Sequence, residues 1–177
     1  MTPPARAVFL FGGSMRRVEI LALAGAMALA LCLAGCTQAD TVKAANAIHA
    51  YLPSVMVLAQ DAATVIEGVD PSEAAKVKSV SAQVQNDLTE LETVSGAYAS
   101  SPSSDEWVRL GAVVDALVSD SDQGLMAAAE IKNPESQAKV KMAMSALDAA
   151  VHAVDGYLLT ARTPEEAQAA VAKRTGK

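Results

Sequence analysis

Four helix-start signals at nearly equal spacing constrain the fold of this chain more than any other feature. A residue type that commonly caps a helix stands at Asp70, Ser103, Asn133 and Thr163. A proline follows the first, third and fourth directly, and an acidic residue comes within three residues of each. Such residues satisfy or replace the free N–H groups at the start of a helix. Because the signals lie roughly 30 residues apart, they predict helices of matched length that run up and down.

Apolar residues recur in steps of three and four through each long segment, which is typical of helices packed at shallow angles. The predicted stripes are Ala45, Ile48, Leu52, Val55, Ala59, Ala62 and Ile66; Val77, Val80, Val84, Leu88, Leu91 and Tyr98; Trp107, Leu110, Val114, Leu117, Leu125 and Ala128; and Met144, Leu147, Val151, Val154 and Leu158. No segment alternates with period two for long enough to form a strand. We therefore predict an all-α fold, an up-and-down four-helix bundle over residues 41–162, with a short helix and frayed tail over 163–177.

Two places disturb this pattern. Pro53 lies inside the first helical segment, where a proline removes a hydrogen bond and clashes with the preceding turn, so we expect a kink or a break there. The polar run 119–124 interrupts the third stripe, and we expect the helix to continue but to loosen. Its aspartates do not make a calcium loop, because Gly124 comes one place early and no glutamate follows at the bidentate position.

The N-terminal stretch has the organisation of a secretory signal. Arg16 and Arg17 precede an apolar run over residues 18–33, which only Glu19 interrupts. The run ends in Leu-Ala-Gly-Cys at residues 33–36, and this ending resembles the lipobox of bacterial lipoproteins. Two alternatives remain open, namely an uncleaved transmembrane helix and, on the two arginines, a twin-arginine signal.

The resemblance implies cleavage between Gly35 and Cys36, diacylglycerol on the Cys36 thiol, and usually a third acyl chain on the new amino terminus. Two or three chains anchor a protein stably, whereas one chain binds only marginally. Residues 1–35 are then a cleaved signal helix, with Met15 expected to be the true start, and 36–40 are a lipidated linker. Thr37 stands where the family's inner-membrane retention signal usually has Asp, so a Gram-negative host implies the periplasmic face of the outer membrane.

Composition limits the partners of the remaining domain. The first 35 residues hold three of the 14 basic and one of the 20 acidic side chains, which leaves 11 and 19, a net charge of −8. Such a surface disfavours nucleic acid and anionic head groups. Cys32 leaves with the signal and Cys36 is the predicted lipid site, so no thiol remains for a disulfide. The domain must therefore be held together by burial of Ala, Val, Leu, Ile and Met side chains.

Two histidines are the candidate ligand-binding residues. His49 and His152 fall at a similar height on the first and last predicted helices, and Asp148 and Asp155 share one helix face with His152. This combination could bind zinc, or the two imidazoles could bind haem. The competing interpretation is that both histidines are solvated or hydrogen-bonded, and no Cys-x-x-Cys-His attachment for covalent haem is present.

Most aromatic residues are predicted at one end of the bundle. The up-and-down order places Tyr98, Trp107 and Tyr157 at the end where the first helix begins, with Tyr51 slightly further along. They either fill the flared end of the bundle or form an aromatic edge toward head groups or a membrane partner.

No convincing catalytic set is present, because the chain lacks a Gly-x-Ser-x-Gly elbow and a glycine-rich phosphate loop. We expect no enzyme activity and no cofactor. The expected function is that of a lipid-anchored envelope lipoprotein acting as an interaction, scaffold or accessory module. Its protein partner would be met by the distal loops near 68–70 and 132–133. The alternative is small-ligand, metal or haem binding within the bundle through His49 and His152.

Overall fold

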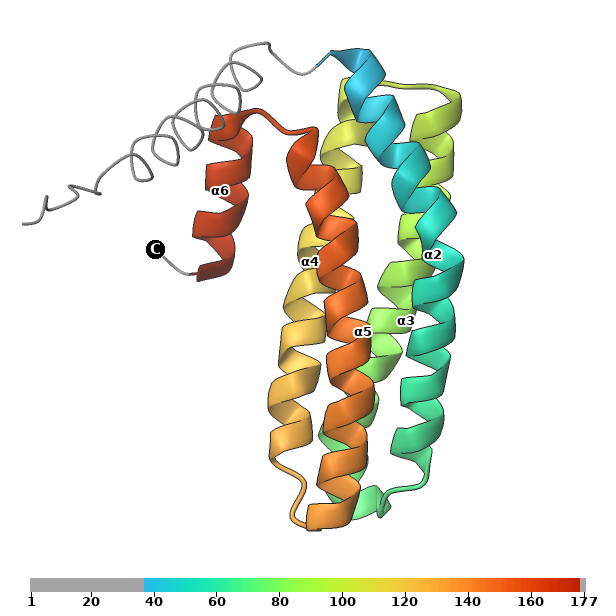
Figure 1. Cartoon of the computed structure of the whole chain (residues 1–177), viewed down its shortest axis with the longest axis vertical. Coiled ribbons are helices and arrows are strands. Elements are labelled where there is room, and N and C mark those ends of the chain that lie inside the picture. Colours follow the sequence, from blue (N-terminus) through green and yellow to red (C-terminus); the bar gives the residue numbers. More distant parts are fainter. Residues whose placement is uncertain (1–36, 176–177) are drawn as a thin grey trace, which may run out of the picture. The chain divides into compact units, whose positions relative to one another are not determined.

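The computed structural model describes residues 37–175. The predicted signal helix, the cleavage site at Gly35 and the lipid site at Cys36 lie outside the described residues. The described part is all-α, as predicted, and consists of four long helices and one short one, which can be followed in Figure 1. The helices are α2 (Gln38–Glu67), α3 (Pro71–Ser100), α4 (Ser104–Ala129), α5 (Pro134–Thr160) and α6 (Pro164–Thr175).

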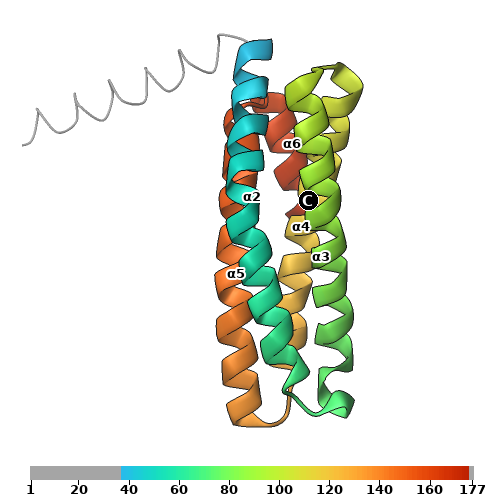
Figure 2. The same ribbon diagram turned by 90° about the vertical axis from the view of Figure 1, so that its right-hand side faces the viewer.

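The four long helices pack as an antiparallel square, which confirms the predicted up-and-down bundle. Helix α2 packs against α3 and α5, and α4 packs against the same two helices (Figures 1 and 2). The α2/α3 and α4/α5 contacts are therefore opposite edges of the square. The short helix α6 lies against α4. Among the helices of residues 38–175, none combines the length and the apolar character needed to cross a bilayer.

The predicted helix-start signals cap the helices as expected. Asp70 accepts a hydrogen bond from Ser72 N at 2.8 Å, and Ser103 Oγ accepts one from Glu106 N at 3.2 Å. Asn133 Oδ1 accepts from two backbone N–H groups at 3.0 Å, and Thr163 and Glu166 bond reciprocally. These bonds satisfy N–H groups that the helices themselves leave free.

The first helix starts earlier than the predicted linker allows. The Asp40 carboxylate accepts hydrogen bonds from Thr37 N at 3.2 Å and from Thr37 Oγ1 at 2.8 Å. This local cap starts α2 at Gln38, inside the stretch 36–40 that we assigned to a linker. Only Thr37 then separates residue 36 from the bundle.

The predicted stripes form the core. Every stripe residue is buried except Val80, Trp107 and Leu125, which are half-buried and pack against the core. The largest fully buried side chains come from all four long helices and include Ile48, Leu52, Leu88, Leu91, Leu110, Leu117, Met144, Leu147 and Leu158. Burial of apolar surface at about 25 cal/mol per Å² is therefore the main force that joins the helices.

The polar run 119–124 continues α4 without a break, because its small residues occupy the core positions. Ser121 and Gly124 are buried, while Asp122 and Gln123 are exposed. A Cβ atom on Gly124 would collide with the terminal methyl group of Met144 on α5. The run thus lets α4 approach α5 closely.

Pro53 lies within α2, which stays one continuous helix of 30 residues rather than two. The proline is exposed, so its ring does not fill the core. Because a proline has no N–H, the carbonyl of His49 loses its helical hydrogen bond.

The substitution Pro53→Ala should stabilise the protein by about 1–3 kcal/mol, because it restores this bond and removes the ring clash. Urea unfolding followed by circular dichroism measures the change, with the exposed neighbour Ser54→Ala as the matched control. A loss of stability in Pro53→Ala would mean that the packing of α2 needs the bend that a proline imposes.

Candidate functional site

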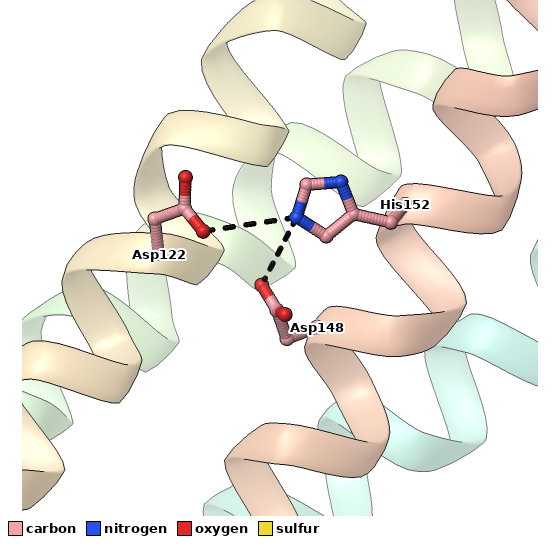
Figure 3. A group of neighbouring side chains, drawn as sticks. All are labelled: Asp122, Asp148 and His152. Carbon is pink, nitrogen blue, oxygen red and sulfur yellow. Dashed lines mark ion pairs between the residues drawn. The ribbon is translucent and has the colours of Figure 1, made fainter. Parts of the chain in front are cut away.

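Three side chains that commonly bind metals converge on the α4/α5 edge of the bundle. Figure 3 shows the His152 ring directed between the carboxylates of Asp122 and Asp148. Its Nε2 atom lies 3.7 Å from Oδ1 of each carboxylate. One ligand atom from each residue lies within 4.8 Å of the others. In the described part of the chain, this is the one group of three or more such residues so arranged.

Helix geometry explains the convergence. Asp148 and His152 are four residues apart on α5 and therefore project from neighbouring turns of one face. Asp122 reaches them from α4, one residue after the buried Ser121. The Ser121 hydroxyl donates a hydrogen bond to Asp148 Oδ1 at 2.8 Å, which orients that carboxylate. Asp148 is mostly buried, whereas Asp122 and His152 are about half exposed.

The two histidines do not form a common site. His49 Nδ1 lies 3.3 Å from Ser95 Oγ of α3, so its ring faces the α2/α3 edge. His152 faces Asp122 at the opposite edge. Asp155, predicted to share a face with His152, is instead buried and lies outside the cluster.

The contact between Ser95 and His49 is not the start of a catalytic arrangement. Ser95 is fully buried, so no substrate can reach its hydroxyl. The hydroxyl also bonds to the backbone carbonyl of Glu92 at 3.2 Å, an ordinary bond for a serine inside a helix. His49 is exposed and completes this local bonding.

Sequence reasoning missed Asp122, although the run 119–124 stood out for its aspartates. The sequence analysis interpreted that run as a loosened helical segment and considered metal binding there only as a calcium loop, in which all ligands come from one short segment. The actual neighbours of Asp122 come from another helix, 26 and 30 residues later. The sequence feature that could have identified Asp122 as a ligand is its place on a polar face of the third helical segment. In an up-and-down bundle, that segment neighbours the fourth, which contains Asp148 and His152.

A second acidic pair lies on the α3/α4 edge. The pKa of Asp87 is raised from an ordinary value of 3.8 to about 6. Burial of the carboxyl group is the largest cause, and the neighbouring carboxyl group of Asp120 is the second. Gln83 donates a hydrogen bond to Asp87 Oδ1 at 3.2 Å, but the buried Oδ2 atom has no hydrogen-bond partner within the described residues. The pair therefore favours a proton on Asp87 in the folded state.

Asp87 should make stability fall as the pH rises. The folded protein holds this proton up to about pH 6, whereas the unfolded chain releases it near pH 3.8. The free energy of unfolding therefore decreases progressively as the pH rises between these two values. We expect Asp87→Asn to remove this decline and to stabilise the protein at pH 7 by on the order of 2 kcal/mol.

Thermal unfolding from pH 4 to pH 7 measures this effect, with the exposed Glu92→Gln on the same helix as the control. Equal destabilisation of Asp87→Asn at both pH values would show that the carboxyl group has a structural role rather than a titrating one.

The aromatic residues pack in two pairs. Tyr98 and Trp107 have ring centroids 5.3 Å apart, and the Tyr98 hydroxyl lies 2.6 Å from Thr41 Oγ1 near the start of α2. Tyr51 and Tyr157 meet edge to face at 6.2 Å. Tyr98 is buried and Trp107 half-buried, in agreement with aromatic filling of this end. A contact of the exposed Tyr157 with head groups stays a prediction.

A cleft of about 350 Å³ lies between α4 and α6. Its lining includes Trp107, Val108, Gly111 and Arg162. Arg162 forms an ion pair with Asp115 at 3.4 Å and approaches Gly111 so closely that a Cβ there would lie 2.6 Å from its Nη2 atom. The guanidinium group is thus used in attaching the α5–α6 connection to α4, a role that sequence reasoning did not anticipate.

Comparison with protein-family models, with curated proteins and with solved structures found no match for this chain. The function is therefore inferred from the residues themselves.

Proposed function

We propose that the protein is a lipid-anchored lipoprotein of the bacterial cell envelope, and that its helical bundle is a non-enzymatic interaction module. The observation that carries this proposal is the sequence Leu-Ala-Gly-Cys at residues 33–36, placed at the end of an apolar run behind two arginines. Signal peptides have this order of charge, apolar run and small residues.

The start of the bundle supports the proposal. Helix α2 begins at Gln38, two residues after the predicted lipid site, and Thr37 and Asp40 cap it. Such a short connection would hold the folded domain close to the membrane surface. Confinement to a surface raises the effective concentration of a module toward a partner in the same envelope.

The far end of the bundle is the proposed partner surface. A helix of 30 residues such as α2 spans about 45 Å, so the α2–α3 and α4–α5 loops lie well away from the start of α2. Glu73 Oε2 accepts a hydrogen bond from Asn133 N at 3.1 Å, and Lys76 pairs with Glu130. These contacts join the two predicted distal loops into one surface.

The alternative function, ligand or haem binding shared by His49 and His152, has less support because these residues face opposite edges of the bundle.

Replacing Cys36 tests the anchor. Intact mass spectrometry of the wild-type protein from a bacterial membrane fraction should give residues 36–177 plus acyl chains. Cys36→Ala should leave an uncut precursor or release the protein from membranes, while the control Cys32→Ala should be processed normally. Lipid-type processing of Cys36→Ala would contradict the anchor.

Crosslinking from the bundle surface tests the interaction. A photo-crosslinking amino acid at exposed Lys132, in the distal loop, should give one adduct of defined mass in intact cells. The same amino acid at exposed Val57, on the side of α2, should not give it. No adduct from position 132, or the same adduct from both positions, would contradict the distal surface as the partner site.

A further inference from the structure

We propose that Asp122, Asp148 and His152 bind a divalent transition-metal ion, such as Zn²⁺, on the α4/α5 edge of the bundle (Figure 3). This site goes beyond the anchoring and interaction proposed above and does not depend on either. It is also distinct from the predicted pairing of His49 with His152.

The spacing of the three donor atoms fits an ion better than direct hydrogen bonds. The two 3.7 Å separations from His152 Nε2 exceed the 2.7–3.2 Å of ordinary hydrogen bonds. Zinc binds nitrogen and carboxylate oxygen at about 2.0–2.2 Å, so two ligand atoms 3.7 Å apart subtend an angle of about 120° at the ion. A small rotation of the exposed Asp122 would bring its oxygen into the same coordination sphere.

The charges in the cluster favour a cation. The carboxylates of Asp122 and Asp148 lie close enough to repel each other. Among the side chains that the structure describes, neither is paired with a lysine or arginine, and the only ion-pair partner of both is His152. A divalent ion would neutralise both carboxylates while the imidazole remained neutral, which is the protonation state that metal binding requires.

The surroundings hold two of the ligands in place before any ion arrives. Asp148 and His152 share one face of α5, and the buried Ser121 hydroxyl bonds to Asp148 Oδ1 at 2.8 Å. Hydrogen bonds of this kind orient metal-binding carboxylates and commonly affect metal affinity about 10–100-fold. The close contact of Gly124 with Met144 keeps α4 near α5, so Asp122 lies within reach.

The donor atoms indicate which class of ion is bound. Calcium and magnesium prefer oxygen ligands alone, whereas an imidazole nitrogen suits zinc, nickel, copper and iron. Three protein ligands leave at least one position for water, the arrangement of an open zinc site. The half-exposed position predicts moderate affinity, with a Kd of about 1–100 µM.

The test uses the full-length protein in detergent, purified without a histidine-containing tag. Zn²⁺ binding is measured by competition with a chromogenic chelator, and Co²⁺ binding by its visible absorption. We expect one ion per protein, and at least about tenfold weaker binding in His152→Gln and in Asp122→Asn. His49→Gln and the exposed Asp61→Asn are matched controls that should bind as the wild type does. Circular dichroism checks that each variant is folded.

Two results would overturn the site. One is no Zn²⁺ binding at concentrations up to about 1 mM, far above the expected Kd. The other is binding that depends on the wrong residues. Either Asp122→Asn would leave it unchanged, or His49→Gln would weaken it as much as His152→Gln does. Neither result would bear on lipidation of Cys36, which the mass of the protein tests separately.

Discussion

Burial of apolar side chains along the centre of the bundle is the interaction on which the rest of this structure depends. Residues 37–177 contain no cysteine, so no disulfide can hold the helices together. The side chains that close the core are mainly Leu, Ile, Val and Ala, and among the aromatic residues of the described part of the chain only Tyr98 is buried. Most of the stability of helices in proteins comes from the packing of their apolar faces rather than from helix propensity. The packing of the apolar helix faces therefore sets the positions of the polar side chains on the helices.

The 119–124 segment shows how this packing also arranges the candidate metal site. Ser121 and Gly124 are small enough to face α5 from inside the bundle, where Met144 covers the glycine. The same turns of α4 direct Asp122 outward, beside Asp148 and His152. Because helix faces repeat every 3.6 residues, small inward residues and acidic outward residues come from one short run. The packing that brings α4 close to α5 therefore also brings the three candidate ligands together.

Acidic side chains at two edges of the square have different roles. At the α3/α4 edge, Asp87 is buried beside Asp120, and this raises its pKa to about 6. At the α4/α5 edge, Asp122 is exposed and lies near the His152 imidazole as well as the mostly buried Asp148. Because Asp87 is buried, its pair with Asp120 lowers the stability of the fold at neutral pH. Because Asp122 is exposed to solvent, the group around His152 is accessible to an ion. The proposed lipid anchor and distal surface are separate from both.

The sequence by itself determined the helices, because caps such as Asp70 and Asn133 and the three-four stripes act over only a few residues. It also determined which faces would be buried, and it contains the Cys36 motif on which the anchor proposal rests. Only the tertiary structure decided that His49 and His152 face opposite edges, that Asp122 joins His152, and that Arg162 pairs with Asp115. Those pairings depend on the rotation and register of neighbouring helices, which are set by packing of the whole core and by no local signal.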